Sequence, residues 1–66
     1  MATTKIIELI GSSPKSWEEA AQNGLTKAAE TVKGIKGIDA VSFTAKVENN
    51  KIVEYHTNMK IAFIVD

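Results

Sequence analysis

The chain has 66 residues, of which 44% are hydrophobic and 24% are charged, so its composition is that of one folded domain (1–66) and not of a disordered segment. Eight lysines balance eight carboxylates, no arginine is present and the formal net charge is +0, which argues against a nucleic-acid partner. The absence of cysteine excludes disulfides and thiol nucleophiles, and no apolar run reaches the ~20 residues of a membrane helix. We therefore expect a cytoplasmic protein without a membrane partner.

The small size of the chain is itself informative. A domain of this length buries only about 60% of the surface that its unfolded chain exposes, and its core rarely supplies more than ~3–5 kcal/mol of net stability. Disulfides are impossible here, and one histidine is a thin basis for a structural metal site. We therefore expect the chain to be stabilised by self-association.

The first half of the sequence predicts a strand followed by a helix. Thr3–Ile10 is short, rich in β-branched residues and followed by turn-forming residues at 11–14. Ser16 and Glu19 have the spacing of a capping box, which starts a helix that the apolar periodicity extends to Lys33. Gly34 is then expected to terminate this helix.

The second half predicts a long β-hairpin. Ile38–Val47 and Ile52–Val65 alternate in polarity with period two, and the Asn-Asn pair at 49–50 suits a two-residue turn. This turn would place Glu48 opposite Lys51.

The register counted from this turn makes further predictions about cross-strand neighbours. It places Asp39 opposite Lys60 and Phe43 opposite His56. It also assigns Met59 to the core, on the sheet face that the helix covers.

The expected fold is therefore α+β, with a β-α-β-β order and a three-stranded antiparallel sheet packed on one helix. An ~18-residue helix spans about 27 Å and a 14-residue strand about 46 Å, so the hairpin must extend past the helix. The second sheet face is left without intramolecular cover. Val41, Phe43 and Val47 are predicted to form an exposed apolar patch on that face, which other copies of the chain would cover.

Two sequence blocks resemble one known family. The strand-turn-helix block KIIELIGSSPKSWEEAAQNGLTKAAETV (5–32) and the final-strand block YHTNMKIAF (55–63) resemble the dodecins in composition and in spacing. Dodecins are small β-α-β-β proteins that form hollow homododecameric shells, and many of them sequester flavins. The resemblance therefore implies a homododecamer and a small-molecule ligand such as FMN or riboflavin.

The resemblance also indicates which residues would form the ligand site. In flavin-binding dodecins a Trp at the start of the second strand stacks on the isoalloxazine ring, and the matching position here is Gly37. A Gln in the last strand, which binds the polar edge of the ring, matches His56, and imidazole cannot offer the paired donor and acceptor of an amide. Flavin binding should therefore be much weakened. Asp39 either contacts a polar ligand group or forms an ion pair with Lys60.

Several residues have alternative interpretations. His56 is either a pocket residue or an interface histidine packed on Phe43. Trp17, at the first helical turn, is expected to pack on the sheet edge or on a neighbouring chain rather than to replace the stacking Trp.

The SPKSWEEAA block also resembles a dodecin subgroup for which calcium is the proposed ligand, although the acidic residues have no recognised calcium-binding spacing. The candidate carboxylates are Glu8, Glu18, Glu19, Asp39 and Glu54.

These observations support two functional hypotheses. The first is a ligand-sequestering protein of the flavin-binding type with an altered pocket that contains Gly37, Asp39 and His56. The alternative is a flavin-free structural shell, organised by calcium or another cation. Catalysis is not expected, because the only histidine has no carboxylate at a sequence spacing that indicates a catalytic pair. The serines Ser12, Ser13 and Ser16 are turn and cap residues.

Overall fold

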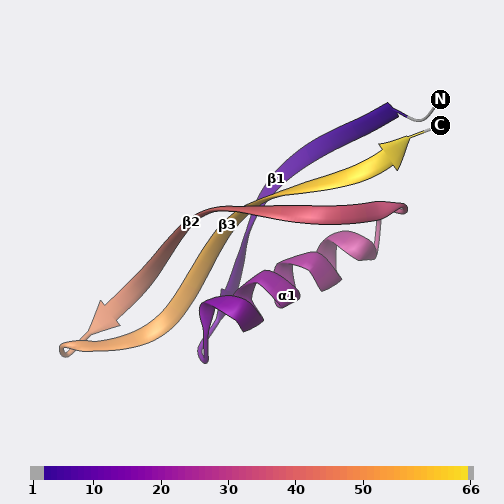
Figure 1. Cartoon of the computed structure of the whole chain (residues 1–66). Coiled ribbons are helices and arrows are strands. Elements are labelled where there is room, and N and C mark those ends of the chain that lie inside the picture. Colours follow the sequence, from indigo (N-terminus) through magenta and orange to yellow (C-terminus); the bar gives the residue numbers. More distant parts are fainter. Residues whose placement is uncertain (1–2, 66) are drawn as a thin grey trace.

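The computed structural model of the chain, described here for residues 3–65, is a three-stranded antiparallel sheet with one helix against one face (Figure 1). The strand order in the sheet is β1-β3-β2, so the last strand lies at the centre. The predicted β-α-β-β fold is confirmed. Its elements are β1 (Thr3–Ser13), α1 (Trp17–Ala29), β2 (Ile35–Glu48) and β3 (Lys51–Val65).

Strand β1 is longer than predicted, because residues 11–13 continue the strand and do not form a turn. The reason is a close approach of the helix to the strand. A Cβ atom on Gly11 would lie 2.0 Å from the carbonyl oxygen of Ala20, and one on Gly24 would lie 2.2 Å from the Cε of Met59. The glycine at position 11 is therefore needed for packing, not for chain reversal.

The start of α1 agrees with the sequence only in part. Ser16 is the N-cap, and its hydroxyl accepts a hydrogen bond of 3.0 Å from the backbone N–H of Glu19. The carboxylate of Glu19 does not complete the predicted capping box, because it accepts a hydrogen bond from the hydroxyl of Ser13. This side chain therefore ties the helix to the end of β1.

The predicted end of the helix was wrong. Helix α1 ends at Ala29 and not at Lys33, with Glu30 as its C-cap. Gly34 has a φ of +77°, as a left-handed glycine would, but it lies beyond the helix, where its carbonyl oxygen accepts a 3.0 Å hydrogen bond from the N–H of Ile64. Residues 31–34 are thus used to bring the chain back onto the sheet.

The hairpin turn is as predicted, but the register beyond it is not. Asn49 and Asn50 both have positive φ angles (53° and 64°), and Glu48 lies opposite Lys51. One register shift at 46/47 and a second at 40/42 displace the pairing between them by one residue. The second shift restores the predicted register.

This displacement of the register moves the side chains in the middle of β2 to the other face of the sheet. Phe43 lies opposite Thr57, not His56, and therefore shares the helix-covered side of the sheet. Trp17 confirms this placement, since its ring centroid lies 6.2 Å from that of Phe43 and 4.8 Å from that of Tyr55. The predicted assignment of Phe43 to the uncovered face, and to an interface with His56, was wrong.

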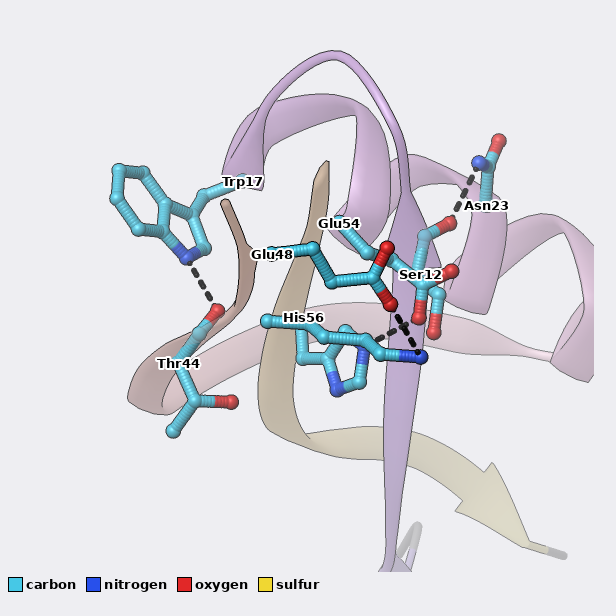
Figure 2. Close-up of polar contacts among 8 residues, drawn as sticks. Ser12, Trp17, Asn23, Thr44, Glu48, Glu54 and His56 are labelled. Atoms are coloured by element: carbon cyan, nitrogen blue, oxygen red, sulfur yellow. Dashed lines mark hydrogen bonds and ion pairs between the residues drawn. The ribbon is translucent and has the colours of Figure 1, made fainter. Parts of the chain in front are cut away.

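The interior of the chain is small. Met59 and Ile61 are completely buried, as are Ala20 and most of Ala28, which confirms the prediction for Met59. Thr57 is also buried, and its hydroxyl donates a 2.8 Å hydrogen bond to the carbonyl oxygen of Trp17. The indole N–H of Trp17 donates in turn to the carbonyl oxygen of Thr44 at 2.9 Å, so this side chain packs on the sheet as expected (Figure 2).

The molecule is much longer than it is thick, with extents of 52 × 20 × 13 Å. Its radius of gyration is 13.5 Å, whereas a compact chain of this length has about 10.8 Å. Its accessible surface of 4835 Å² likewise exceeds the ~4100 Å² expected for the mass. The β2–β3 hairpin extends well past the helix, as predicted (Figure 1). Within residues 3–65, no helix is long and apolar enough to cross a membrane.

Candidate ligand site on the open sheet face

The sheet face opposite α1, called the open face below, is built from regular cross-strand rows. Because paired residues share a face and Met59 and Ile61 face the helix, the residues between them on β3 point the other way. Each row contains one residue from β1, β3 and β2 in that order. The rows are Ile6–Ala62–Gly37, Glu8–Lys60–Asp39, Ile10–Asn58–Ser42 and Ser12–His56–Thr44.

The first end of the open face has a hollow of about 220 Å³. It contains two of the three residues predicted for the ligand site, Gly37 and Asp39. Apart from its two chain neighbours, no residue would have an atom within 4 Å of a Cβ on Gly37, so this position has room for a large side chain or for a ligand. The complete lining is Ile6, Gly37, Ile38, Asp39, Lys60 and Ala62.

A charged row borders this hollow. Lys60 lies between Glu8 on β1 and Asp39 on β2, so the predicted opposition of Asp39 and Lys60 is confirmed. Among the residues that the structure describes, Lys60 has no carboxylate oxygen within 4.0 Å. Its ammonium group and the two carboxylates are therefore all available to a polar ligand group.

The second end of the open face is polar and is centred on His56. Its Nε2 atom lies 2.5 Å from Oε1 of Glu54, and it is flanked by Ser12 on β1 and by Thr44 on β2 (Figure 2). The neighbouring Asn58 has a buried side-chain oxygen without a hydrogen-bond partner in the described part of the chain. This end of the face thus offers an imidazole, a carboxylate and an unsatisfied amide oxygen.

One chain does not bring the three predicted site residues together. Gly37 pairs with Ala62, whereas His56 lies six residues earlier on β3, a separation of about 20 Å. Gly37 and Asp39 therefore belong to the hollow, and His56 belongs to the polar end. The residues predicted for the site did not include Ile6, Asn58 or Lys60. Alternate residues of a strand lie on one face, so Asn58 and Lys60 could have been inferred from His56.

The five candidate calcium ligands are also dispersed. Glu18 and Glu19 lie at the start of α1, Glu8 and Asp39 lie on either side of Lys60, and Glu54 contacts His56. Within residues 3–65, no group of three or more His, Cys, Asp or Glu residues could hold a metal ion. Calcium takes six to eight oxygen ligands, usually several of them from carboxylates, and the described part of one chain does not gather such a set.

The Dodecin family model matches residues 3–66. The chain belongs to the dodecin family. A curated relative, the calcium dodecin of Mycobacterium tuberculosis, is 29% identical over 63 residues, which are 96% of this chain and 89% of the relative. The resemblance seen in the sequence is thereby confirmed.

Solved structures agree with the observed fold. The dodecin of Streptomyces davaonensis matches with a TM-score of 0.94 at 23% identity, over 98% of this chain and 96% of that one. The dodecin of Streptomyces coelicolor gives 0.95 at 20% identity, over 98% and 93%. The M. tuberculosis calcium dodecin, described as having a novel calcium-binding site, gives 0.84 at 26% identity, over 97% and 91%. These matches confirm the dodecin fold.

Proposed function

We propose that this dodecin is a binding protein that assembles into a homododecameric shell and sequesters a small ligand on its open face. The observation that carries this proposal is the hollow of about 220 Å³ at Gly37, on a face that the chain's own helix does not cover. The resemblance matches Gly37 to the Trp that stacks on the flavin ring, which supports the hollow as the place where the ligand would lie. The role is one of storage, not catalysis.

The shape of the chain supports self-assembly. Ile6 and Ile10 are each 61% exposed on the open face, so a second copy that packs there would remove much apolar surface from water. The excess of surface and the few completely buried side chains indicate that one copy alone is marginally stable. Identical copies that pack on the open face would bury these residues and enclose the hollow.

The lining of the hollow supports a small, partly apolar ligand, with flavin bound weakly. Ile6, Ile38 and Ala62 provide apolar walls, and Lys60 and Asp39 provide one cation and one anion. Gly37 offers no aromatic face, and stacking on such a face is worth ~1–3 kcal/mol per ring in comparable settings. FMN and riboflavin, the ligands that the resemblance implies, should therefore bind much more weakly than to a dodecin that has the Trp.

A fluorescence titration of the assembled protein tests this proposal. Addition of the protein to riboflavin or FMN should quench the flavin fluorescence only at high protein concentration, whereas the Gly37→Trp variant should quench it at ~10-fold lower concentration or less. Lys36→Trp is the matched control, because Lys36 does not line the hollow. If an intact Gly37→Trp assembly binds flavin no better than the Lys36→Trp assembly, the location of the site is wrong.

A cation-organised shell without flavin is the second candidate. It is favoured by the likeness to the M. tuberculosis calcium dodecin. Since the carboxylates of one chain do not cluster, we propose that the site would combine Glu8, Asp39 or Glu54 from different copies. A melting temperature that rises with calcium and falls with a chelator supports this candidate, and a melting temperature independent of both excludes it.

A further inference from the structure

A second hollow lies on the helix side of the molecule, between α1 and β2. It forms because α1 lies mainly against β1 and β3, so that the side of the helix toward β2 is left open. The hollow has a volume of about 560 Å³, and it is called the helix groove below. Its residues are Ser16, Glu18, Glu19, Ala21, Gln22, Leu25 and Ile38.

The helix groove has an apolar floor and an acidic rim. Leu25 is half-buried and Ile38 is 42% exposed, so both side chains have apolar surface free for a partner. Glu18 is exposed on the rim, and within residues 3–65 no lysine nitrogen lies within 4.0 Å of its carboxylate. The groove therefore suits an apolar segment that carries positive charge.

The chain itself contains such a segment at the tip of its hairpin, residues 46–53. This tip extends beyond the N-terminal end of α1 and has no other element against it (Figure 1). Val47 is 58% exposed and Ile52 is 47% exposed. Lys51 is adjacent to the turn and free of ion pairs in the described part of the chain, whereas Lys46 is held by Glu48 at 3.5 Å in an exposed pair.

We propose that the hairpin tip of one copy inserts into the helix groove of a neighbouring copy. Val47 and Ile52 would then pack on Leu25 and Ile38, and Lys51 would approach the carboxylate of Glu18. Contacts of this kind join two different surfaces, so they run head to tail and close into a ring when the rotation between copies allows it. The proposal rests on the self-assembly proposed above, and the helix groove shares only Ile38 with the ligand hollow.

The tip of a chain cannot reach its own groove. Trp17, at the start of α1, contacts the backbone of Thr44. From that contact Leu25 lies about 12 Å along the helix, whereas Val47 lies about 10 Å along the strand in the other direction, toward the tip. The two residues are therefore about 20 Å apart in one molecule, far beyond the ~4.4–6.8 Å between the Cα atoms of a disulfide.

Disulfide trapping tests the contact directly, because the natural chain has no cysteine. The double variant Leu25→Cys with Val47→Cys, oxidised as an intact assembly, should give a ladder of covalent multimers on a non-reducing gel. Asn23→Cys with Val47→Cys is the matched control, since Asn23 lies on the β1 side of α1 and donates a 2.9 Å hydrogen bond to the carbonyl of Ser12. The control should give at least ~10-fold less of the crosslinked product.

The possible results separate this inference from the proposed function. An intact assembly in which the Leu25 pair crosslinks no better than the control overturns the groove contact and leaves the shell proposal standing. A chain that remains monomeric overturns both. A charge exchange gives a second test: Glu18→Lys and Lys51→Glu should each weaken assembly by ~10-fold or more, and the two changes together should restore it. Failure of the double variant to assemble better than either single variant contradicts the inference.

Discussion

The two faces of the sheet differ in how closely they are packed, and this difference explains their different roles in stability and in binding. On the covered face, Gly11 and Gly24 let the helix approach the sheet so closely that an added Cβ would collide with a neighbour. On the open face, no residue other than the two chain neighbours of Gly37 has an atom within 4 Å of where its Cβ would be. The covered face thus holds the chain together, and the open face is left for a ligand and for other copies.

The largest effect is expected from a glycine exchange that compares the two faces. Gly11→Val should prevent recovery of folded protein. The Cβ of the valine would lie 2.0 Å from a backbone carbonyl oxygen, which can shift only at a large cost in free energy. Gly37→Val should fold and assemble as the natural chain does. Circular dichroism and size-exclusion chromatography of both variants make the comparison, and equal recovery of the two would contradict the packing described here.

The next largest effect concerns the core. Met59→Ala should lower the free energy of unfolding by ~2–5 kcal/mol, because the side chain is completely buried between helix and sheet. Denaturant unfolding at one fixed protein concentration measures this change, since the stability of an oligomer depends on concentration. A loss below about 1 kcal/mol would mean that the helix does not pack on Met59 as described.

A third substitution sharpens the comparison by asking whether the open face is covered in the assembly. Ile10 is 61% exposed in the single chain, so Ile10→Ala should cost at most about 0.5 kcal/mol if the face stays in water. We expect a cost of ~2 kcal/mol or more, because copies that pack on this face would bury the side chain. The same unfolding experiment decides between these values.

The smallest effect is expected at the helix start. Ser16→Ala should cost ~1 kcal/mol, because it removes the 3.0 Å hydrogen bond that the serine hydroxyl accepts from the N–H of Glu19. Ser16→Asp is the control and should retain most of the stability. The midpoints of denaturant unfolding compare the three proteins, and an unchanged midpoint for the alanine variant would contradict the capping role.

Local signals in the sequence predicted the fold well. The Asn-Asn turn, the N-cap at Ser16 and the alternation of the last strand each depend on a few adjacent residues, and all three appear in the structure. The predicted ends of the helix and of β1 were wrong, because tertiary contacts decide where these two elements end. Gly34 is needed beside Ile64, and Gly11 is needed beneath Ala20.

The candidate site was harder to predict from the sequence. The opposition of Asp39 and Lys60 was found because the two register shifts cancel before that point. The residue opposite His56 on β2 was predicted wrongly, because the β-bulges that shift the register depend on packing and twist rather than on the polarity pattern. The large distance between Gly37 and His56 was not predicted either. It depends on where the two residues lie along the β2–β3 pair, whereas the resemblance gives only their matching sequence positions.

The central claim is that a single chain leaves one sheet face open and that identical copies cover it. Native mass spectrometry, or light scattering coupled to size exclusion, tests this claim most directly at micromolar concentration. We predict one dominant particle of twelve chains, roughly twelve times the 7.2 kDa of one chain. A well-folded monomer of 7.2 kDa under the same conditions would contradict the account.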